Sequence, residues 1–318
     1  MKKVNFLIFL LILNLSASEK LKVGVLAFGT VNWELNVIKH HKLDKKYGFD
    51  LDIVKLASKN ATSVAFQSKS VDIFVTDWIW VNTQRASGKD FTFYPYSKAN
   101  GTMYINKNNN AKTILDLEGQ SIGIAGGPVD KTWLILRAYS KLKYGKDLKN
   151  IIKPVFAAPP ILMKKVLDGS LDGAINFWHF NAKVKAKGAK EFIRIKDVFA
   201  SFGIKEDIST VGWTFRRDIA LENKKLYNSF IKATHEAKDI LINNKKEWER
   251  IKPLMNVKDE KTFNALIDGY KAGVIKDFTK KNIKDSSKIF EILLKQGGRK
   301  LVKNSNYLQT KTFWDFEK

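Results

Sequence analysis

Two kinds of hydrophobic pattern alternate along this chain. Short runs rich in β-branched residues are typical of buried strands, and they predict strands at residues 21–27, 51–56, 71–75, 91–96, 102–106, 121–125, 152–157, 171–176, 192–195 and 210–215. Between them, apolar residues at helical spacing predict helices at 33–47, 61–67, 78–86, 129–141, 160–167 and 182–187. From residue 221 the chain is predicted to be helical almost throughout, at 224–243, 246–255, 259–272 and 284–296. This alternation predicts an α/β fold with mostly parallel sheets flanked by helices.

Chain length and one polar segment indicate the domain organisation. A chain of 318 residues is long enough for two domains of ~150 residues each. Asn106–Lys112 contains three consecutive asparagines with lysines on both sides, so it cannot contribute to a hydrophobic core. We interpret it as a surface loop or a hinge between two α/β halves, with the helical segments as a tail.

The first 18 residues are typical of a secretory signal peptide. Met1 is followed by two lysines, a short apolar run and small residues before Glu19. The apolar run is too short to cross ~30 Å of hydrocarbon as a helix, so an uncleaved anchor is the less favoured alternative. We therefore expect export to the periplasm. Lipidation is not expected, because the chain has no cysteine to carry a lipid.

The chain is strongly basic, with 56 lysines and arginines against 32 acidic residues. Only seven of the basic residues are arginines, whereas base readout and phosphate clamps favour arginine, and no nucleic-acid-binding motif occurs. We therefore expect a lysine-rich soluble surface and no nucleic-acid partner. The absence of cysteine removes disulfides and thiolate metal sites. His40 and His41 are adjacent within a predicted helix and should face different directions, so no metal or cofactor is predicted.

Four segments carry a resemblance to a known family. They are Gly29–Leu35, Val71–Trp78, Leu117–Ile124 and Val166–Ala174. Their order, together with the signal peptide, resembles the periplasmic substrate-binding proteins of ABC importers, and more narrowly the nitrate, sulfonate, taurine and thiamine-precursor group. The resemblance covers nearly the whole chain after the signal peptide, and it lies in the order of the segments rather than in a single motif.

The resemblance implies a two-lobed periplasmic-binding-protein fold of type II, which holds a ligand between the lobes and closes about hinges. It places lobe one at residues 19–112 and 214–318 and lobe two at 113–213, with hinges at Asn106–Lys112 and Thr210–Arg216. It also implies a small-molecule ligand, an ABC permease in the membrane as partner, and no catalytic role. We expect the protein to be a monomer.

Candidate binding residues follow from the positions of the strand ends. Ligands of open α/β sheets bind beyond the carboxyl ends of the strands. Thr30, Asn32 and Trp33 follow the first strand, where Thr30 or Asn32 is alternatively a helix N-cap and Trp33 a packing lid. Asp77 and Trp78 follow the third strand, and Asp77 is favoured as an N-cap over a ligand contact.

A glycine-containing turn supplies the next candidates. Gly127, Val129 and Asp130 precede a predicted helix, where free backbone N–H groups favour an anion. A glycine pair before a helix is also found in ordinary tight turns, and no phosphate-binding lysine motif follows it. We therefore keep both interpretations of these three residues.

The last candidates are aromatic or stand beside aromatic residues. Asn176 and Trp178 follow a strand and would supply a polar tip and a stacking wall. Trp213, at the presumed second crossing, either lines the cleft or packs against the hinge. His179 is more typical of a structural histidine than of a titrating one.

The ligand class is inferred from the same residues. Tryptophans near strand ends favour a flat or aromatic group, and a helix N-terminus with a basic surface favours an anion. We expect a small anionic or aromatic organic molecule, such as a sulfonate, carboxylate or heterocyclic precursor. Two alternatives are an exported ligand sensor and an enzyme on the same fold, of pyrimidine-synthase or menaquinone-pathway type. The Cys-rich motif of the pyrimidine synthases is missing from this sequence.

Overall fold

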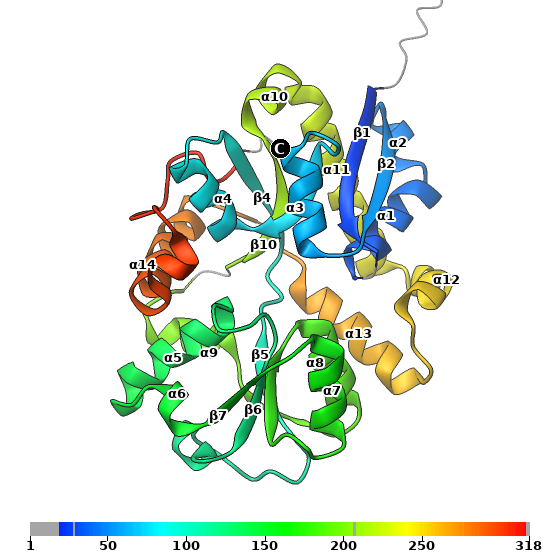
Figure 1. Cartoon of the computed structure of the whole chain (residues 1–318). Coiled ribbons are helices and arrows are strands. Elements are labelled where there is room, and N and C mark those ends of the chain that lie inside the picture. The colour runs from blue at the N-terminus through cyan, green and yellow to red at the C-terminus, as the bar shows by residue number, and fades with distance from the viewer. Residues whose placement is uncertain (1–18, 28, 206–207, 276, 316–318) are drawn as a thin grey trace, which may run out of the picture.

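The computed structural model describes residues 19–27, 29–205, 208–275 and 277–315, so the predicted signal peptide lies outside the described residues. The described chain forms two five-stranded sheets, one in each of two lobes (Figure 1). The first sheet has the order β2-β1-β3-β10-β4, made of β1 (Glu19–Leu26), β2 (Phe49–Leu56), β3 (Ile73–Asp77), β4 (Phe91–Ser97) and β10 (Val211–Arg216). β1 is parallel to β2 and β3, whereas β10 is antiparallel to β3 and β4.

The second sheet repeats the topology of the first. Its order is β7-β6-β8-β5-β9, made of β5 (Thr102–Ile105), β6 (Ser121–Ile124), β7 (Lys153–Phe156), β8 (Gly173–Asn176) and β9 (Lys190–Ile193). β6 is parallel to β7 and β8, whereas β5 is antiparallel to β8 and β9. β5 and β10, the strands that follow each crossing between lobes, thus take equivalent places in the two sheets. The predicted two-lobed α/β fold is confirmed.

Helices surround both sheets (Figure 1). The first lobe carries α1 (Val31–His40), α2 (Leu43–Lys46), α3 (Lys59–Gln67), α4 (Trp78–Ala86), α10 (Arg217–Glu222), α11 (Lys224–Asn243) and α12 (Lys245–Met255). The second lobe carries the 3-10 helix η1 (Ile114–Leu117) and the α-helices α5 (Lys131–Tyr144), α6 (Leu148–Ile151), α7 (Pro159–Leu167), α8 (Trp178–Ala186) and α9 (Ile195–Ser201). No helix in the described ranges has the length and apolar character needed to span a bilayer.

Several helices begin at side chains that satisfy free backbone N–H groups. Asp77 accepts a hydrogen bond from the N–H of Trp80 at 2.9 Å, and Asp130 accepts one from the N–H of Trp133 at 3.0 Å. This is the usual role of an aspartate at an N-cap, where it replaces a missing intrahelical partner. Two of the predicted site residues are therefore also the residues that start α4 and α5.

The first crossing between lobes comes earlier than the sequence indicated. β4 ends at Ser97 and β5, which begins at Thr102, already pairs in the second sheet, so the chain crosses at residues 98–101. Asn106–Lys112 instead folds onto the second lobe, where Asn106 Nδ2 donates to the carbonyl oxygen of Leu171 at 3.1 Å. The expected boundary at residue 112 differs because a polar composition marks a surface loop without showing which lobe it belongs to.

The two crossings run side by side and are joined by hydrogen bonds. Asn100 donates to the carbonyl oxygen of Ile208 at 3.0 Å and accepts from the hydroxyl of Thr210 at 2.8 Å. The hydroxyl of Ser209 donates to the carbonyl oxygen of Ser97 at 2.8 Å. The second crossing therefore enters β10 next to the expected hinge at Thr210–Arg216, with the first crossing as its neighbour.

The helical tail contacts both lobes. α13 (Glu260–Gly273) packs against α8 of the second lobe, and α14 (Lys280–Val302) packs against α5 of the second lobe and α4 of the first (Figure 1). Gly269 lets α13 pack closely on α8, because a Cβ at this position would lie 3.0 Å from ring carbons of Trp178 and would push that ring away. The tail, expected to belong to lobe one alone, therefore bridges the junction between the lobes.

Candidate functional site

The ends of parallel strands from the two lobes meet at the junction between the lobes. Trp33, after β1, lies edge-on to Trp178, after β8, with ring centroids 6.2 Å apart. Lys59, after β2, places its ammonium group 4.9 Å from the centre of the Phe177 ring, also after β8. Because ligands of α/β sheets bind beyond the carboxyl ends of strands, this junction is the candidate binding site.

An ion pair connects the lobes at this junction. Lys131 Nζ, at the start of α5, lies 2.9 Å from Asp77 Oδ2, at the end of β3. Burial favours a higher pKa for Asp77, but the charge and hydrogen bond of Lys131 and the N–H of Trp80 lower the pKa overall. At neutral pH the carboxylate is therefore ionised and ties the first lobe to the second.

A small pocket lies at the junction between the lobes. The residues that line it are Thr30, Tyr96, Ser97, Trp178, Lys238, Tyr270, Gly273 and Val274. Its free volume is about 10 Å³, which is roughly what one water molecule requires. The lobes are therefore close together in this structure, and an organic ligand needs them to move apart before it can enter.

The floor of the pocket is a buried ion pair. Lys238 Nζ of α11 donates to both carboxylate oxygens of Glu34 of α1, at 2.7 and 2.8 Å, and the Tyr270 hydroxyl donates to the same carboxylate at 3.0 Å. The ammonium group also lies 4.4 Å from the centre of the Tyr96 ring. Burial raises the pKa of Glu34 and lowers the pKa of Lys238, and the attraction between the two opposes both shifts. The pair gives the pocket a fixed polar surface.

Sequence reasoning did not single out this pair. Glu34 lies among the buried residues of α1, and Lys238 lies among the buried residues of α11. A charged residue on the apolar face of a helix is rarely buried without a partner. The positions of Glu34 and Lys238 on apolar faces were therefore the one sign in the sequence that each has a buried partner. The pairing itself joins residues 204 positions apart, so local pattern could not reveal it.

Three of the predicted tryptophans lie in the hydrophobic core. Trp78 and Trp213 are fully buried, and neither indole N–H has a partner among the described residues. Trp33 is 4% exposed and packs against Trp248 and Tyr270 with ring centroids 6.0 and 6.3 Å apart. In this arrangement of the lobes none of the three indoles has an exposed face to offer a ligand.

Both predicted asparagines hold local backbone. Asn32 Nδ2 donates to the carbonyl oxygens of Leu26 at 2.9 Å and Gly29 at 3.2 Å, which fixes the loop between β1 and α1. Asn176 Nδ2 donates to the carbonyl oxygen of Pro159 at 3.0 Å, and its Oδ1 accepts from the N–H of Phe177. These amides shape the strand ends, and the Nδ2 group of each is already engaged by backbone carbonyls.

The turn before α5 is built by its own residues. Gly127 has a φ of 81°, a left-handed conformation that favours glycine, and no described atom lies near the place of an added Cβ. The N–H of Asp130 donates to the carbonyl oxygen of Gly127 at 3.0 Å, so this N–H is already used within the turn. Burial raises the pKa of Asp130, which also interacts with the charges of Lys131 and Lys59. An acidic side chain in this turn makes a site for a free anion less favourable here. Val129 lies within this turn, between Gly127 and Asp130.

The remaining predicted residues stay candidates for ligand contact. Thr30 and Trp178 line the pocket, and Asp77 belongs to the ion pair that joins the lobes. Trp178 is half-buried and comes from the second lobe, whereas Thr30 comes from the first. A ligand held between them would contact both lobes.

His179 follows Trp178 and lies partly buried among aromatic rings. Its ring centroid lies 4.4 Å from that of Phe180 and 5.7 Å from that of Trp178. Burial and the charge of Lys183 lower the pKa of His179 to about 4. The imidazole is therefore neutral at pH 7, in agreement with the structural role we favoured.

We expect this histidine to make the fold sensitive to mild acid. Between pH 6.5 and 4 the unfolded chain binds a proton that the folded chain excludes, so stability present above pH 6.5 is lost as pH falls. The free energy of unfolding should fall by about 3 kcal/mol more in the wild type than in His179→Gln over this range. Urea unfolding followed by circular dichroism at several pH values measures it, and equal pH slopes in both proteins would contradict it.

Comparisons with known proteins agree with the geometry. A family model described as "NMT1/THI5 like" matches residues 45–248. The fold resembles the periplasmic aliphatic sulphonate binding protein SsuA from Escherichia coli, at 15% identity and a TM-score of 0.71, covering 94% of this chain and 95% of that one.

Two further solved structures are similar. The alkanesulfonate-binding protein SsuA from Xanthomonas axonopodis pv. citri, bound to MOPS, matches at 17% identity and a TM-score of 0.69, covering 94% of this chain and 99% of that one. The periplasmic nitrate-binding protein NrtA from Synechocystis matches at 16% identity and a TM-score of 0.56, covering 79% and 70%. A search of curated protein sequences finds no significant match.

Proposed function

This chain belongs to the NMT1/THI5-like family, and on that premise we propose that it is the solute-binding receptor of an ABC importer. The observation that carries the proposal is the pocket between the lobes, lined by Thr30 from the first lobe, Trp178 from the second and Tyr270 from the bridging tail. A ligand bound there would contact both lobes and α13 of the tail. Binding would therefore stabilise the closed form that a membrane permease can recognise.

The ligand we propose is a small organic molecule that is anionic or has a flat ring, such as a sulfonate, carboxylate or heterocyclic precursor. Trp178 supplies an aromatic surface, and Lys131 and Lys238 supply positive charge now balanced by acidic partners. The similar proteins are named for binding sulfonates and nitrate, which supports an anionic ligand for this protein.

We further propose that the protein is a monomer in the periplasm and has no catalytic role. The titratable groups at the floor of the pocket already bind one another, because Glu34, Lys238 and Tyr270 form one hydrogen-bonded cluster. A general acid or base needs a free group within reach of the substrate, and this cluster does not offer one. Its chemistry fits binding better than proton transfer.

Native mass spectrometry of the protein purified from its own periplasm tests the function. We expect one co-purified small molecule, released on denaturation, whose return to the empty protein makes the particle more compact in small-angle X-ray scattering. An empty protein would next be screened by thermal shift against sulfonates, carboxylates and pyrimidines. If no compound in the screen stabilised the fold, the proposal that the protein is a solute receptor would be contradicted.

Replacing Trp178 by alanine should weaken binding of the identified ligand by about 1–3 kcal/mol, because the ligand loses its aromatic wall. Isothermal titration calorimetry measures the change. Trp80→Ala is the matched control, since Trp80 is a partly buried tryptophan that stacks on Phe91 of the first lobe and does not line the pocket. Equal affinity of Trp178→Ala and the wild type would make Trp178 a packing residue only.

A further inference from the structure

The end of α1 brings two histidines together. α1 ends at His40, and His41 is its C-cap with φ −85° and ψ 5°, followed by Lys42 in the left-handed conformation with φ 53°. The predicted helix over 33–47 is therefore broken here, and the two imidazole rings lie 4.9 Å apart at 87°. The expectation that they face different directions is wrong, because it assumed an unbroken helix.

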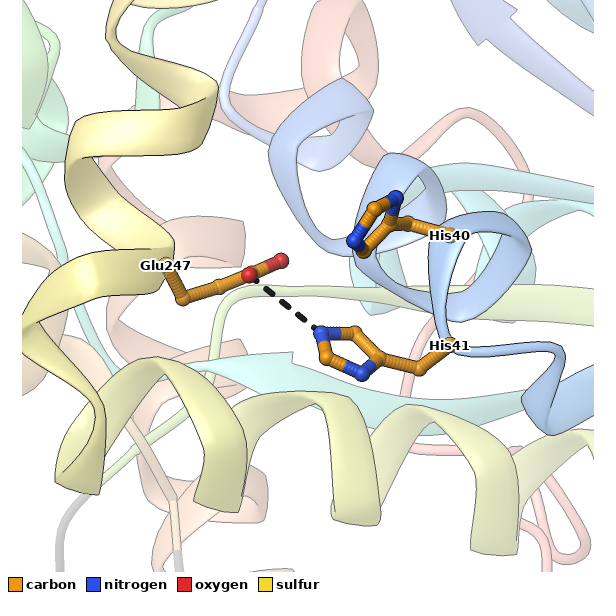
Figure 2. A group of neighbouring side chains, drawn as sticks. All are labelled: His40, His41 and Glu247. Carbon is orange, nitrogen blue, oxygen red and sulfur yellow. Dashed lines mark ion pairs between the residues drawn. The ribbon is translucent and has the colours of Figure 1, made fainter.

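A carboxylate from another helix completes the group. Glu247 of α12 points toward the histidines, with its Oε2 3.3 Å from His41 Nε2 (Figure 2). Arg250 holds the other carboxylate oxygen, Oε1, at 2.6 Å. A ligating carboxylate is usually oriented by such a hydrogen bond to its second oxygen. The Glu247 side chain is 5% exposed whereas that of His41 is 33% exposed, so a fixed buried ligand faces a group that solvent can reach.

The geometry is near that of a transition-metal site. One donor atom from each of the three side chains lies within 4.8 Å of the other two. Tetrahedral zinc, with bonds of about 2.0–2.1 Å, separates its ligand atoms by roughly 3.3 Å. His41 and Glu247 already have this separation, and His40 is exposed and can rotate inward.

We propose that His40, His41 and Glu247 bind a divalent transition metal such as Zn²⁺, Cu²⁺ or Ni²⁺, with the remaining position open to water. Two imidazole nitrogens and one carboxylate oxygen select these ions over Ca²⁺ and Mg²⁺, which prefer oxygen ligands. The site is separate from the pocket between the lobes. α1 has 10 residues and is ~15 Å long, with Thr30 of the pocket before its first residue and the histidines at its last.

A bound metal would join α1 to α12 and stabilise the folded first lobe, because it binds the folded chain more tightly than the unfolded chain. Solute binding does not depend on it, so this proposal and the receptor function can fail independently.

Calorimetric titration of the EDTA-treated, untagged protein with ZnCl₂ tests the site. We expect one equivalent to bind, and affinity at least tenfold weaker in His40→Ala, which is exposed and cannot disturb the core. Co²⁺ should give the intense visible absorption of a tetrahedral site, and that absorption should be lost in the same variant.

His179→Gln is the control, since it removes a histidine in the other lobe and should leave zinc affinity unchanged. Glu247→Gln tests whether the Glu247 carboxylate is the third metal ligand. Circular dichroism should confirm that this variant is folded. The proposal is wrong if no zinc binds, if His40→Ala binds as the wild type does, or if cobalt gives a weak octahedral spectrum.

Discussion

Replacing Glu34 by glutamine should lower the free energy of unfolding by about 3–5 kcal/mol, because it leaves the ammonium group of Lys238 buried without a counter-charge. The Glu34 and Lys238 side chains are 0% and 7% exposed, so little water is available to take the place of the lost carboxylate. Urea unfolding at pH 7, followed by tryptophan fluorescence and circular dichroism, measures the change.

An exposed ion pair supplies the control for this prediction. Lys20 and Asp52 lie 3.0 Å apart with side chains 58% and 35% exposed, and Lys20→Ala should cost no more than about 1 kcal/mol. A double variant, Glu34→Leu with Lys238→Met, should recover most of the lost stability, since it removes both buried charges. A loss below about 1 kcal/mol in Glu34→Gln would show that water reaches the pair.

Replacing Trp33 by alanine should also cost about 3–5 kcal/mol of folding free energy, because the indole fills the space between α1, α12 and α13. Its ring contacts those of Trp248, Tyr270 and Trp178, so the substitution leaves a cavity that three rigid aromatic neighbours cannot fill. Thermal and urea unfolding measure the loss.

Two variants separate packing from ligand contact at this position. Trp33→Phe keeps most of the volume and should cost clearly less than the alanine variant. Trp178→Ala, at a half-buried position on the pocket wall, should destabilise less than Trp33→Ala. If Trp33→Ala kept near wild-type stability but lost ligand binding, Trp33 would be a ligand contact and not a packing residue.

These two predictions bear on function because the buried pair lies under the pocket. Lys238 and Tyr270 line the pocket and at the same time bind Glu34. Tyr270 belongs to α13, which packs against α8 of the second lobe. Changes in the first lobe can therefore reach the second lobe through one helix of the tail.

Local pattern determined most of the elements and the class of fold. α11 has the bounds 224–243 expected from its apolar spacing, and α4 has the expected bounds 78–86. Such agreement is physical, because a helix or strand must turn its apolar positions toward a core wherever that core lies. The short helices α2, α6, α9 and α10 were not predicted as separate elements, since four to seven residues carry too little periodicity.

The sequence by itself determined a two-lobed α/β protein, its family resemblance and the strand ends where a ligand would bind. Only the tertiary structure decided which residues at those ends are accessible to a ligand. Trp33, Trp78, Trp178 and Trp213 look alike in sequence, yet of these four only Trp178 lines the pocket. The reason is that burial depends on neighbours far along the chain, as in the pairing of Glu34 with Lys238 and of His41 with Glu247. Local pattern indicates that a side chain faces inward, but not what it meets there.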